Sequence, residues 1–179
     1  IRTLLISLAR LHTPADLQLY MVSMMGGGLN DLGDLPHAAQ VVHGTQGERI
    51  RRLFARLLDT LDNRQSTPDD AAPVILLVID PFESFRDAYY EQHMPALQRL
   101  ISEGHGAGIY VILAANSISI LPDRLRSLMP QRIALALSSP ADYAVTVGPL
   151  ADKQVADLPP GRGFVPGNPP LTCQIALPD

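Results

Sequence analysis

The chain has 179 residues, which is enough for one domain with a substantial core. Hydrophobic residues make up 46% of it, charged residues 18%, and the formal net charge is −4. These values exclude a tail that coats nucleic acid by bulk positive charge, so a DNA partner would need a local basic patch.

The sequence indicates no covalent or metal cross-link. One cysteine, Cys173, excludes an intramolecular disulfide and a zinc site of several thiolates, and we interpret it as a small core residue. The five histidines lack the paired spacing of a metal site. No apolar run reaches the roughly 20 residues that cross a bilayer, and residues 1–5 do not resemble a signal peptide. Because no initiator methionine is present, we expect the chain to be a piece of a larger protein.

The first third of the chain predicts two helices separated by a strand. Apolar residues recur at helical spacing over residues 1–11, and residues 12–14 end that helix. Residues 17–22 predict a strand, which the run Gly26 to Gly28 ends; we interpret this run as a turn rather than an anion cradle. In the second helix Thr45 and Glu48 predict a capping box, and the apolar positions after it are Ile50, Leu53, Phe54, Leu57, Leu58 and Leu61.

The middle of the chain predicts two buried strands and a helix between them. Residues 74–79 contain no polar side chain and end on Asp80, which is typical of a central parallel strand covered on both faces. Residues 91–103 carry apolar side chains at helical spacing. Residues 109–115 predict the next strand, which ends on Asn116.

The last third predicts a short helix over residues 121–128 and a further buried strand over residues 132–137. Residues 163–165 and 171–177, separated by a Pro/Gly turn, predict an antiparallel hairpin. The chain therefore predicts an α/β fold: a mostly parallel sheet with flanking helices and a C-terminal β-hairpin, as a single domain over residues 1–179.

Asp80 and Asn116 are the candidates for chemistry because ligands collect at the carboxyl ends of parallel strands. A carboxylate held at a rigid strand end can orient Mg²⁺ and its waters against nucleotide phosphates, as a Walker B motif does. An aspartate in this place can equally cap the following helix. From this feature alone, both interpretations stay open.

The order of the motifs resembles FtsK/SpoIIIE-type P-loop ATPases, in particular the EccC-like and EssC-like modules of type VII secretion systems. Residues 1–9 resemble the helix after the Walker A loop, and residues 13–20 resemble the approach to the next strand. The other matching segments are residues 26–29, 35–37, 49–64, the strand ending at Asp80, and residues 108–116, 132–138, 160–163 and 174–178.

The resemblance implies a RecA-like P-loop NTPase core that, in the intact protein, uses ATP and Mg²⁺. It implies a hexameric or multi-domain ATPase that couples nucleotide binding to the movement of DNA or of a secreted protein. It also implies a cytoplasmic domain of a membrane-anchored bacterial protein, with the membrane contact outside this chain.

Residue roles follow from the same resemblance. Asp80 becomes the Walker B carboxylate that holds Mg²⁺ through water, and Asn116 becomes the residue that senses the γ-phosphate and positions the attacking water. Glu83 is a candidate base, although we expect it to be a solvated loop residue. The candidates for an arginine finger are Arg132, Arg124 and Arg126. The candidate for a direct contact with the nucleotide is Arg162.

Two departures from the family pattern matter. No Gly-x-x-x-x-Gly-Lys-Ser/Thr occurs, so we expect the chain to lack the N-terminal strand and phosphate-binding loop. Pro81 follows Asp80 where DNA-translocating relatives have a catalytic glutamate, and proline cannot polarise water. We therefore favour a degenerate, nucleotide-binding regulatory module. The alternatives are an active ATPase or DNA translocase whose P-loop lies upstream, and a structural oligomerisation domain.

The expected partners are other ATPase modules of the same polypeptide or further copies in a homo-oligomer, together with a secreted protein substrate. DNA is less favoured because the chain is acidic and Lys153 is its only lysine. In RecA-like sheets the strand before the P-loop is interior. We therefore expect an open slot beside the sheet, filled by an upstream segment or by another copy.

Overall fold

The computed structural model describes residues 1–25, 28–69 and 71–176. It divides into two compact units, Ile1–Ala115 and Asn116–Asp179, which are described separately. Gly26 and Gly27, two of the three residues of the predicted glycine turn, lie outside the described residues.

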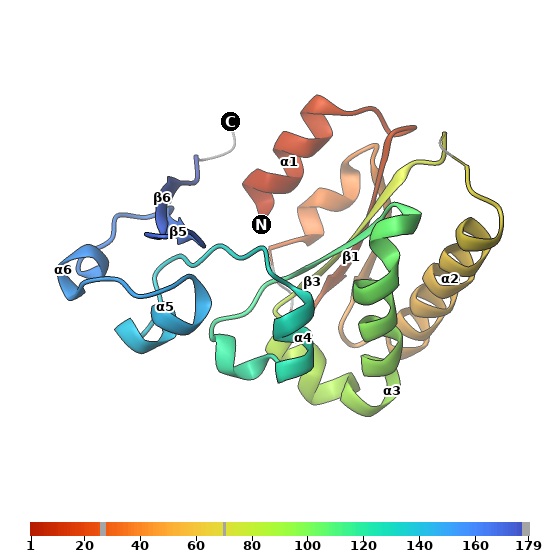
Figure 1. The fold of residues 1–179 in the computed structure, drawn as a ribbon. Coiled ribbons are helices and arrows are strands. Elements are labelled where there is room, and N and C mark those ends of the chain that lie inside the picture. Colours follow the sequence, from red (N-terminus) through yellow and green to blue (C-terminus); the bar gives the residue numbers. More distant parts are fainter. Residues whose placement is uncertain (26–27, 70, 177–179) are drawn as a thin grey trace. The chain divides into compact units, whose positions relative to one another are not determined.

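The first unit is a parallel sheet between two helical layers (Figure 1). The strand order is β2-β1-β3-β4, with bounds Ala38–His43, Leu17–Ser23, Val74–Asp80 and Ile109–Leu113. One face carries α1 (Arg2–Leu11) and the 3-10 helix η1 (Asn30–Asp34), and the other carries α2 (Gly47–Ser66) and α3 (Phe82–Glu103). A second 3-10 helix, η2 (Gly104–Ala107), leads into β4. The predicted α/β class and parallel sheet are confirmed.

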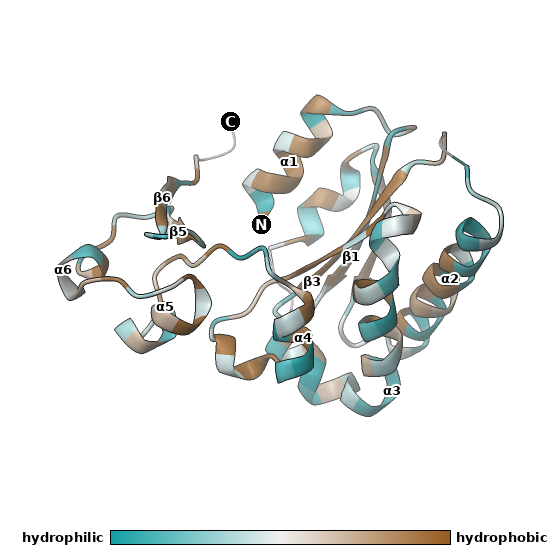
Figure 2. Ribbon diagram, in the orientation of Figure 1, coloured by the Kyte–Doolittle hydropathy of each residue, from teal (hydrophilic) through white to brown (hydrophobic). Residues whose placement is uncertain are grey.

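Burial on both faces explains the apolar runs in β1 and β3. Leu19 and Met21 of β1 pack with Leu5 of α1 in one core cluster. The alternate residue Tyr20 lies under Arg56 of α2, whose guanidinium carbon is 5.9 Å from the ring centroid. β1 pairs with β3 along its whole length, from Leu17 opposite Val74 to Ser23 opposite Asp80. Figure 2 shows hydrophobic colour along these strands, as the sequence predicts for central parallel strands.

The start of α2 differs from the prediction. Gln46 is the N-cap residue and no side chain caps the helix, so the predicted capping box of Thr45 and Glu48 is wrong. The Gln46 side chain instead accepts a hydrogen bond from the backbone N–H of His43 at 3.2 Å, while Glu48 pairs with two arginines of its own helix. Glu48 stays in the first turn of the helix, where its carboxylate binds Arg51 and Arg52 rather than a backbone N–H.

Two further elements of the first unit were mispredicted. β2 was missed because its mixed side chains, at a sheet edge, give no continuous apolar run. α3 begins at Phe82 rather than at residue 91. Glu83 therefore lies in the first turn of a helix, half-buried, and not in a solvated loop as expected.

The second unit holds short elements. They are η3 (Ile118–Ile120), α4 (Asp123–Leu128), α5 (Pro140–Thr146), α6 (Asp152–Val155), β5 (Arg162–Val165) and β6 (Leu171–Gln174). β5 and β6 pair antiparallel, which confirms the predicted hairpin. The predicted buried strand over residues 132–137 is wrong: only Ala134 forms a bridge, to Phe164, and the flanking Ile133 and Leu135 are exposed.

A buried tyrosine and a glycine hold residues 132–137 against the hairpin. The Tyr143 hydroxyl donates to the Leu135 carbonyl and accepts from the Leu137 N–H, both at 2.8 Å. A Cβ at Gly163 would lie 2.5 Å from the Ala134 carbonyl oxygen, so only glycine fits this approach. The segment is therefore fixed by two local contacts rather than by a ladder.

Replacement of Tyr143 by Phe should destabilise the second unit by about 1–3 kcal/mol, because it removes the hydroxyl partner of two backbone groups without changing the ring packing. Chemical denaturation should show the loss. Tyr90→Phe is the matched control, since Tyr90 is 47% exposed and should change stability little. Equal effects of the two variants would contradict the role of the Tyr143 hydroxyl.

A buried aromatic cluster joins α2 to α3. His93 is 5% exposed and stacks on Phe54 with ring centroids 4.9 Å apart, beside Phe85 and Tyr89. No described residue hydrogen-bonds to its Nε2. Burial, with a smaller contribution from the Arg51 charge, lowers the pKa of His93. The folded state therefore favours the neutral imidazole.

Because the folded-state pKa of His93 lies below its value in the unfolded chain, the unfolded chain binds more protons, and stability is lost as the pH falls through 6.5 and below. His93→Phe should remove this acid-side loss and leave stability at pH 8 equal or higher. Thermal melting of the native protein and the variant at a series of pH values between 5 and 8 tests this prediction. Parallel pH profiles of the two proteins would refute the assignment.

Candidate functional site

The candidate site lies at the carboxyl edge of the first unit's sheet, where backbone hydrogen bonds fix the chain after β3. The N–H of Met24, just after β1, donates to the Asp80 carbonyl at 2.8 Å. The N–H of Phe82 donates to the Ala114 carbonyl at 2.7 Å, and the Ala114 N–H donates to Ile79 at 3.0 Å. Asp80 is thus held between the ends of two neighbouring strands.

The Asp80 carboxyl group is half-buried and lies near Ile1 and the Glu83 carboxylate. Burial is the main cause that raises its pKa, and the Glu83 carboxylate raises it further. The start of α1, Asp80 and the first turn of α3 therefore lie at the same edge of the sheet.

Asp80 does not cap the helix that follows it, α3. The N-cap of α3 is Pro81, reached through a cis peptide bond, and no side chain caps this helix. No described residue hydrogen-bonds to the Asp80 carboxylate, so the capping interpretation has no support in the geometry. Its oxygens are available to a ligand.

The donor set fits magnesium only if a nucleotide supplies further oxygens. Within residues 1–25, 28–69 and 71–176, no group of three or more His, Cys, Asp or Glu could hold a metal ion. Mg²⁺ keeps several waters and is commonly bound through one or two carboxylates plus substrate phosphates. A lone strand-end carboxylate such as Asp80, with Glu83 near it, suits that mode of binding.

β1 also ends on a polar residue, Ser23, which was not among the predicted site residues. Ser23 is fully buried at the carboxyl edge, opposite Asp80 in the β1–β3 register, and its carbonyl accepts from the Gly44 N–H at 2.9 Å. The sequence contained a signal for this residue, because Ser23 ends an apolar strand just as Asp80 does.

The other predicted site residues belong to the second unit. Asn116 is its first residue. Arg132 donates to the backbone carbonyls of Met129, Val145, Thr146 and Arg126, and Arg162 donates to the Gln174 side chain at 2.8 Å. Arg126 pairs with Asp123, whereas Arg124 is exposed. Their roles towards a nucleotide stay predictions.

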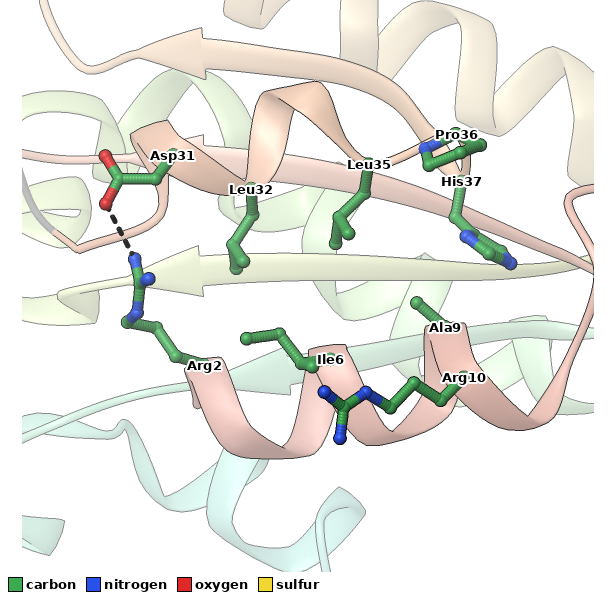
Figure 3. Close-up of a pocket in the computed structure, with 9 residues that line it drawn as sticks. All are labelled: Arg2, Ile6, Ala9, Arg10, Asp31, Leu32, Leu35, Pro36 and His37. Carbon is green, nitrogen blue, oxygen red and sulfur yellow. Dashed lines mark hydrogen bonds and ion pairs between the residues drawn. The ribbon is translucent and has the colours of Figure 1, made fainter. Parts of the chain in front are cut away.

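Two cavities flank the sheet of the first unit. One, of about 460 Å³, lies between α1 and η1, with Ile6, Leu32 and Leu35 along it (Figure 3). The Arg2–Asp31 ion pair, at 3.1 Å, spans one end of it. The other, of about 440 Å³, opens at the carboxyl edge and is lined by Met24, Met25, His43, Gly44, Thr45 and Ser84. Asp80 lines neither cavity.

No helix in the described part of the chain combines the length and apolar character needed to cross a membrane. Fold neighbours at low identity include the conjugation coupling protein TcpA with ATPγS, at 17% identity and a TM-score of 0.68 over 90% of this chain and 52% of that one. The parallel sheet, its strand-end carboxylate and these neighbours place the chain in the class of P-loop NTPase folds.

The sequence model of the FtsK/SpoIIIE family matches residues 1–162, and the chain belongs to that family. EccC of Thermomonospora curvata is 30% identical over 92% of this chain, and EccC3 of Mycobacterium tuberculosis is 33% identical over 92%. The chain spans only 14% of the length of each of these relatives. The solved structure of T. curvata EccC ATPases 2 and 3 with a signal sequence peptide shares 29% identity and a TM-score of 0.84, over 99% of this chain and 35% of that one. The predicted resemblance to EccC and EssC modules is confirmed.

Replacing Asp80 by Asn should stabilise the fold at pH 7, by roughly 1–3 °C in melting temperature. The pKa of Asp80 is raised by burial, so the folded state prefers the protonated form, and stability is lost as the pH rises through the folded-state pKa. The gain should shrink on acidification towards pH 4, where the native carboxyl group is also neutral. A destabilised variant at pH 7 would mean that the charge of Asp80 has a native partner.

Proposed function

We propose that this chain is a nucleotide-binding module of a type VII secretion-like FtsK/SpoIIIE ATPase, with a regulatory rather than a strongly hydrolytic role. The observation that carries the proposal is the Asp80 carboxylate. It ends a central strand, is half-buried, accepts no described hydrogen bond, and lies near Glu83 and the start of α1. A carboxylate left in this state costs stability unless a ligand uses it.

In this proposal Asp80 orients the magnesium ion through water, and Asn116 contacts the γ-phosphate. The magnesium ion, when bound with ATP, would neutralise charge on the phosphates. Arg162 would contact the nucleotide, while Arg132, Arg124 and Arg126 are the candidates for a contribution to a neighbour's site. Arg124 suits the last role best because it is exposed and no carboxylate pairs with it in the described residues.

The sheet supports the idea that a further strand completes the nucleotide site. Within the described residues β4 pairs with β3 alone, although all five of its side chains are apolar or aromatic. Tyr110 on β4 is 40% exposed, and Leu4 and Leu11 of α1 are 41% and 76% exposed. A strand carrying a phosphate-binding loop would pair with this edge and cover apolar surface.

Residues after Asp80 favour weak hydrolysis. Pro81 has neither a carboxylate nor an N–H, so it cannot activate water. Glu83 lies one helical turn further, near enough to Asp80 to affect its pKa. If Glu83 replaces the missing base, the module is an active ATPase or DNA translocase, which is the first alternative. A structural oligomerisation domain, which would bind no nucleotide, is the second.

The comparisons support protein rather than DNA as the cargo. The solved EccC structure contains ATPases 2 and 3 with a signal sequence peptide, and another structure is described as the cytoplasmic domain of EccC. We propose that the present module likewise acts on the cytoplasmic side, beside other ATPase modules or further copies, on a secreted protein. Attachment to the membrane would come from other regions of the protein.

The test is nucleotide stoichiometry in the complete protein. Equilibrium binding of a fluorescent ATP analogue with Mg²⁺ should show one bound nucleotide fewer per chain in Asp80→Asn, or an affinity at least about tenfold lower at one site. Asp87→Asn, an exposed carboxylate on α3, is the matched control and should bind as the native protein does. Unchanged binding in Asp80→Asn would exclude Asp80 from the site.

Turnover separates the regulatory module from the active ATPase. With the other modules inactivated by substitution, we expect hydrolysis at background level. Hydrolysis well above background that is lost in Glu83→Gln would overturn the regulatory proposal in favour of the first alternative. Absence of any nucleotide bound by this module would favour the oligomerisation domain.

A further inference from the structure

The cavity between α1 and η1 has an apolar middle. Its volume of about 460 Å³ lies within the usual range of small-molecule sites. In Figure 3, Ile6 points into the cavity from α1, and Leu32 and Leu35 point into it from η1 and the residue that follows η1. The other apolar residues of the lining are Ala9 and Pro36. These side chains offer no hydrogen bond, so the middle suits an apolar group.

Side-chain contacts bound the cavity at both ends. At one end the Arg2 guanidinium donates to the Asp31 carboxylate at 3.1 Å and to the Gly28 carbonyl at 3.0 Å. At the other end the His37 ring points from the start of β2 towards Ala9 of α1 (Figure 3). A cavity bounded in this way fits a ligand of limited length better than a polypeptide that runs through it.

His37 is a buried polar side chain with one unused nitrogen. It is 6% exposed, and its Nε2 lies 2.8 Å from the His12 carbonyl oxygen. Because a carbonyl oxygen can only accept, Nε2 carries the proton of this hydrogen bond. No described residue hydrogen-bonds to the other nitrogen, Nδ1. A buried polar atom without a partner costs stability, and a ligand in the cavity can remove that cost.

The lining carries a net positive charge. The charged side chains that line the cavity with His37 are Arg2 and Arg10 of α1 and Asp31 of η1. Among the described residues, none of β1 or β2 lines it. Two arginines against one aspartate favour an anionic head group over a cationic one.

A carboxylate head group couples binding to a proton. The lone pair of neutral Nδ1 repels a carboxylate, whereas the Nδ1–H of a protonated ring donates a hydrogen bond to it. Binding of a carboxylate at His37 therefore takes up one proton from solution, and the bound pair is an imidazolium and a carboxylate. The affinity for the carboxylate falls as the pH rises, because the proton becomes scarcer.

We propose that the cavity between α1 and η1 binds a small amphipathic carboxylate of the fatty-acid type. The apolar chain packs on Ile6, Leu32 and Leu35, and the carboxylate accepts a hydrogen bond from protonated His37. Arg10 adds to the positive charge that attracts the head group. The proposal does not depend on nucleotide binding at Asp80, which does not line this cavity.

Calorimetric titration of the complete protein with octanoate tests the ligand class. At about pH 6 we expect a dissociation constant of about 1 mM or lower. Between about pH 6 and pH 8 the affinity should fall by up to about tenfold per pH unit, since each binding event takes up a proton. Octanol has the same apolar chain without the charge, and it should bind at least about tenfold more weakly.

Two variants locate the binding. His37→Gln keeps an amide N–H that can donate to the His12 carbonyl but removes Nδ1, so octanoate should bind about tenfold more weakly at about pH 6 and without pH dependence. Ala9→Leu adds a larger side chain to the lining and should also weaken binding. His105→Gln, an exposed histidine on η2, is the matched control and should bind octanoate as the native protein does.

The proposal is wrong if the native protein does not bind octanoate, or if His37→Gln and Ala9→Leu bind it as the native protein does. Equal affinity for octanol and octanoate, or an equal loss in His105→Gln, would also overturn it. Tighter binding of a short peptide with a C-terminal leucine carboxylate would mean that the occupant is a protein terminus and not a small molecule. Because the two substitutions lie on opposite sides of the cavity, one still decides the matter if circular dichroism shows the other variant to be unfolded.

Discussion

The requirement that β1 and β3 be covered on both faces organises the first unit. Both strands are apolar on both sides, so helices must lie above and below the sheet, and parallel connections deliver them there. Parallel pairing also brings the carboxyl ends of the strands to one edge. The candidate site, with Ser23 and Asp80 in register, is a direct result of that arrangement.

At this edge the chain holds the Asp80 carboxyl group in a state that costs stability. The Asp80 carboxylate is partly removed from water, faces the charge of Glu83, and is not used to cap α3. Raised carboxyl pKa values of this kind gather at functional sites. The backbone bonds from Met24 and Phe82 hold the strand end in place, so the side chain has a fixed origin from which to meet a ligand.

Much of the first unit could be predicted from the sequence, because its signals are uniform over many residues. The runs of β1 and β3 and the helical period of α2 each depend on one repeated feature. β2 could not be predicted, since an edge strand with mixed side chains has no such run. The prediction of a buried strand over residues 132–137 was wrong because the segment contacts the hairpin around Phe164 through a single bridge, at Ala134. At the site, Asp80 could be predicted from the sequence. The position of Glu83 could not, because it depends on α3 beginning directly after its N-cap residue, Pro81.

Within the described residues β4 pairs with β3 alone, and this unpaired edge has a consequence for aggregation. Ile109 to Leu113 contains neither a charge nor a proline, the usual devices that stop one sheet from extending into another. While this edge is unpaired, it can pair with exposed strands of other incompletely folded chains and so start aggregation. A further strand of the kind proposed above, if it paired with β4 early in synthesis, would protect the chain against aggregation as well as completing the nucleotide site.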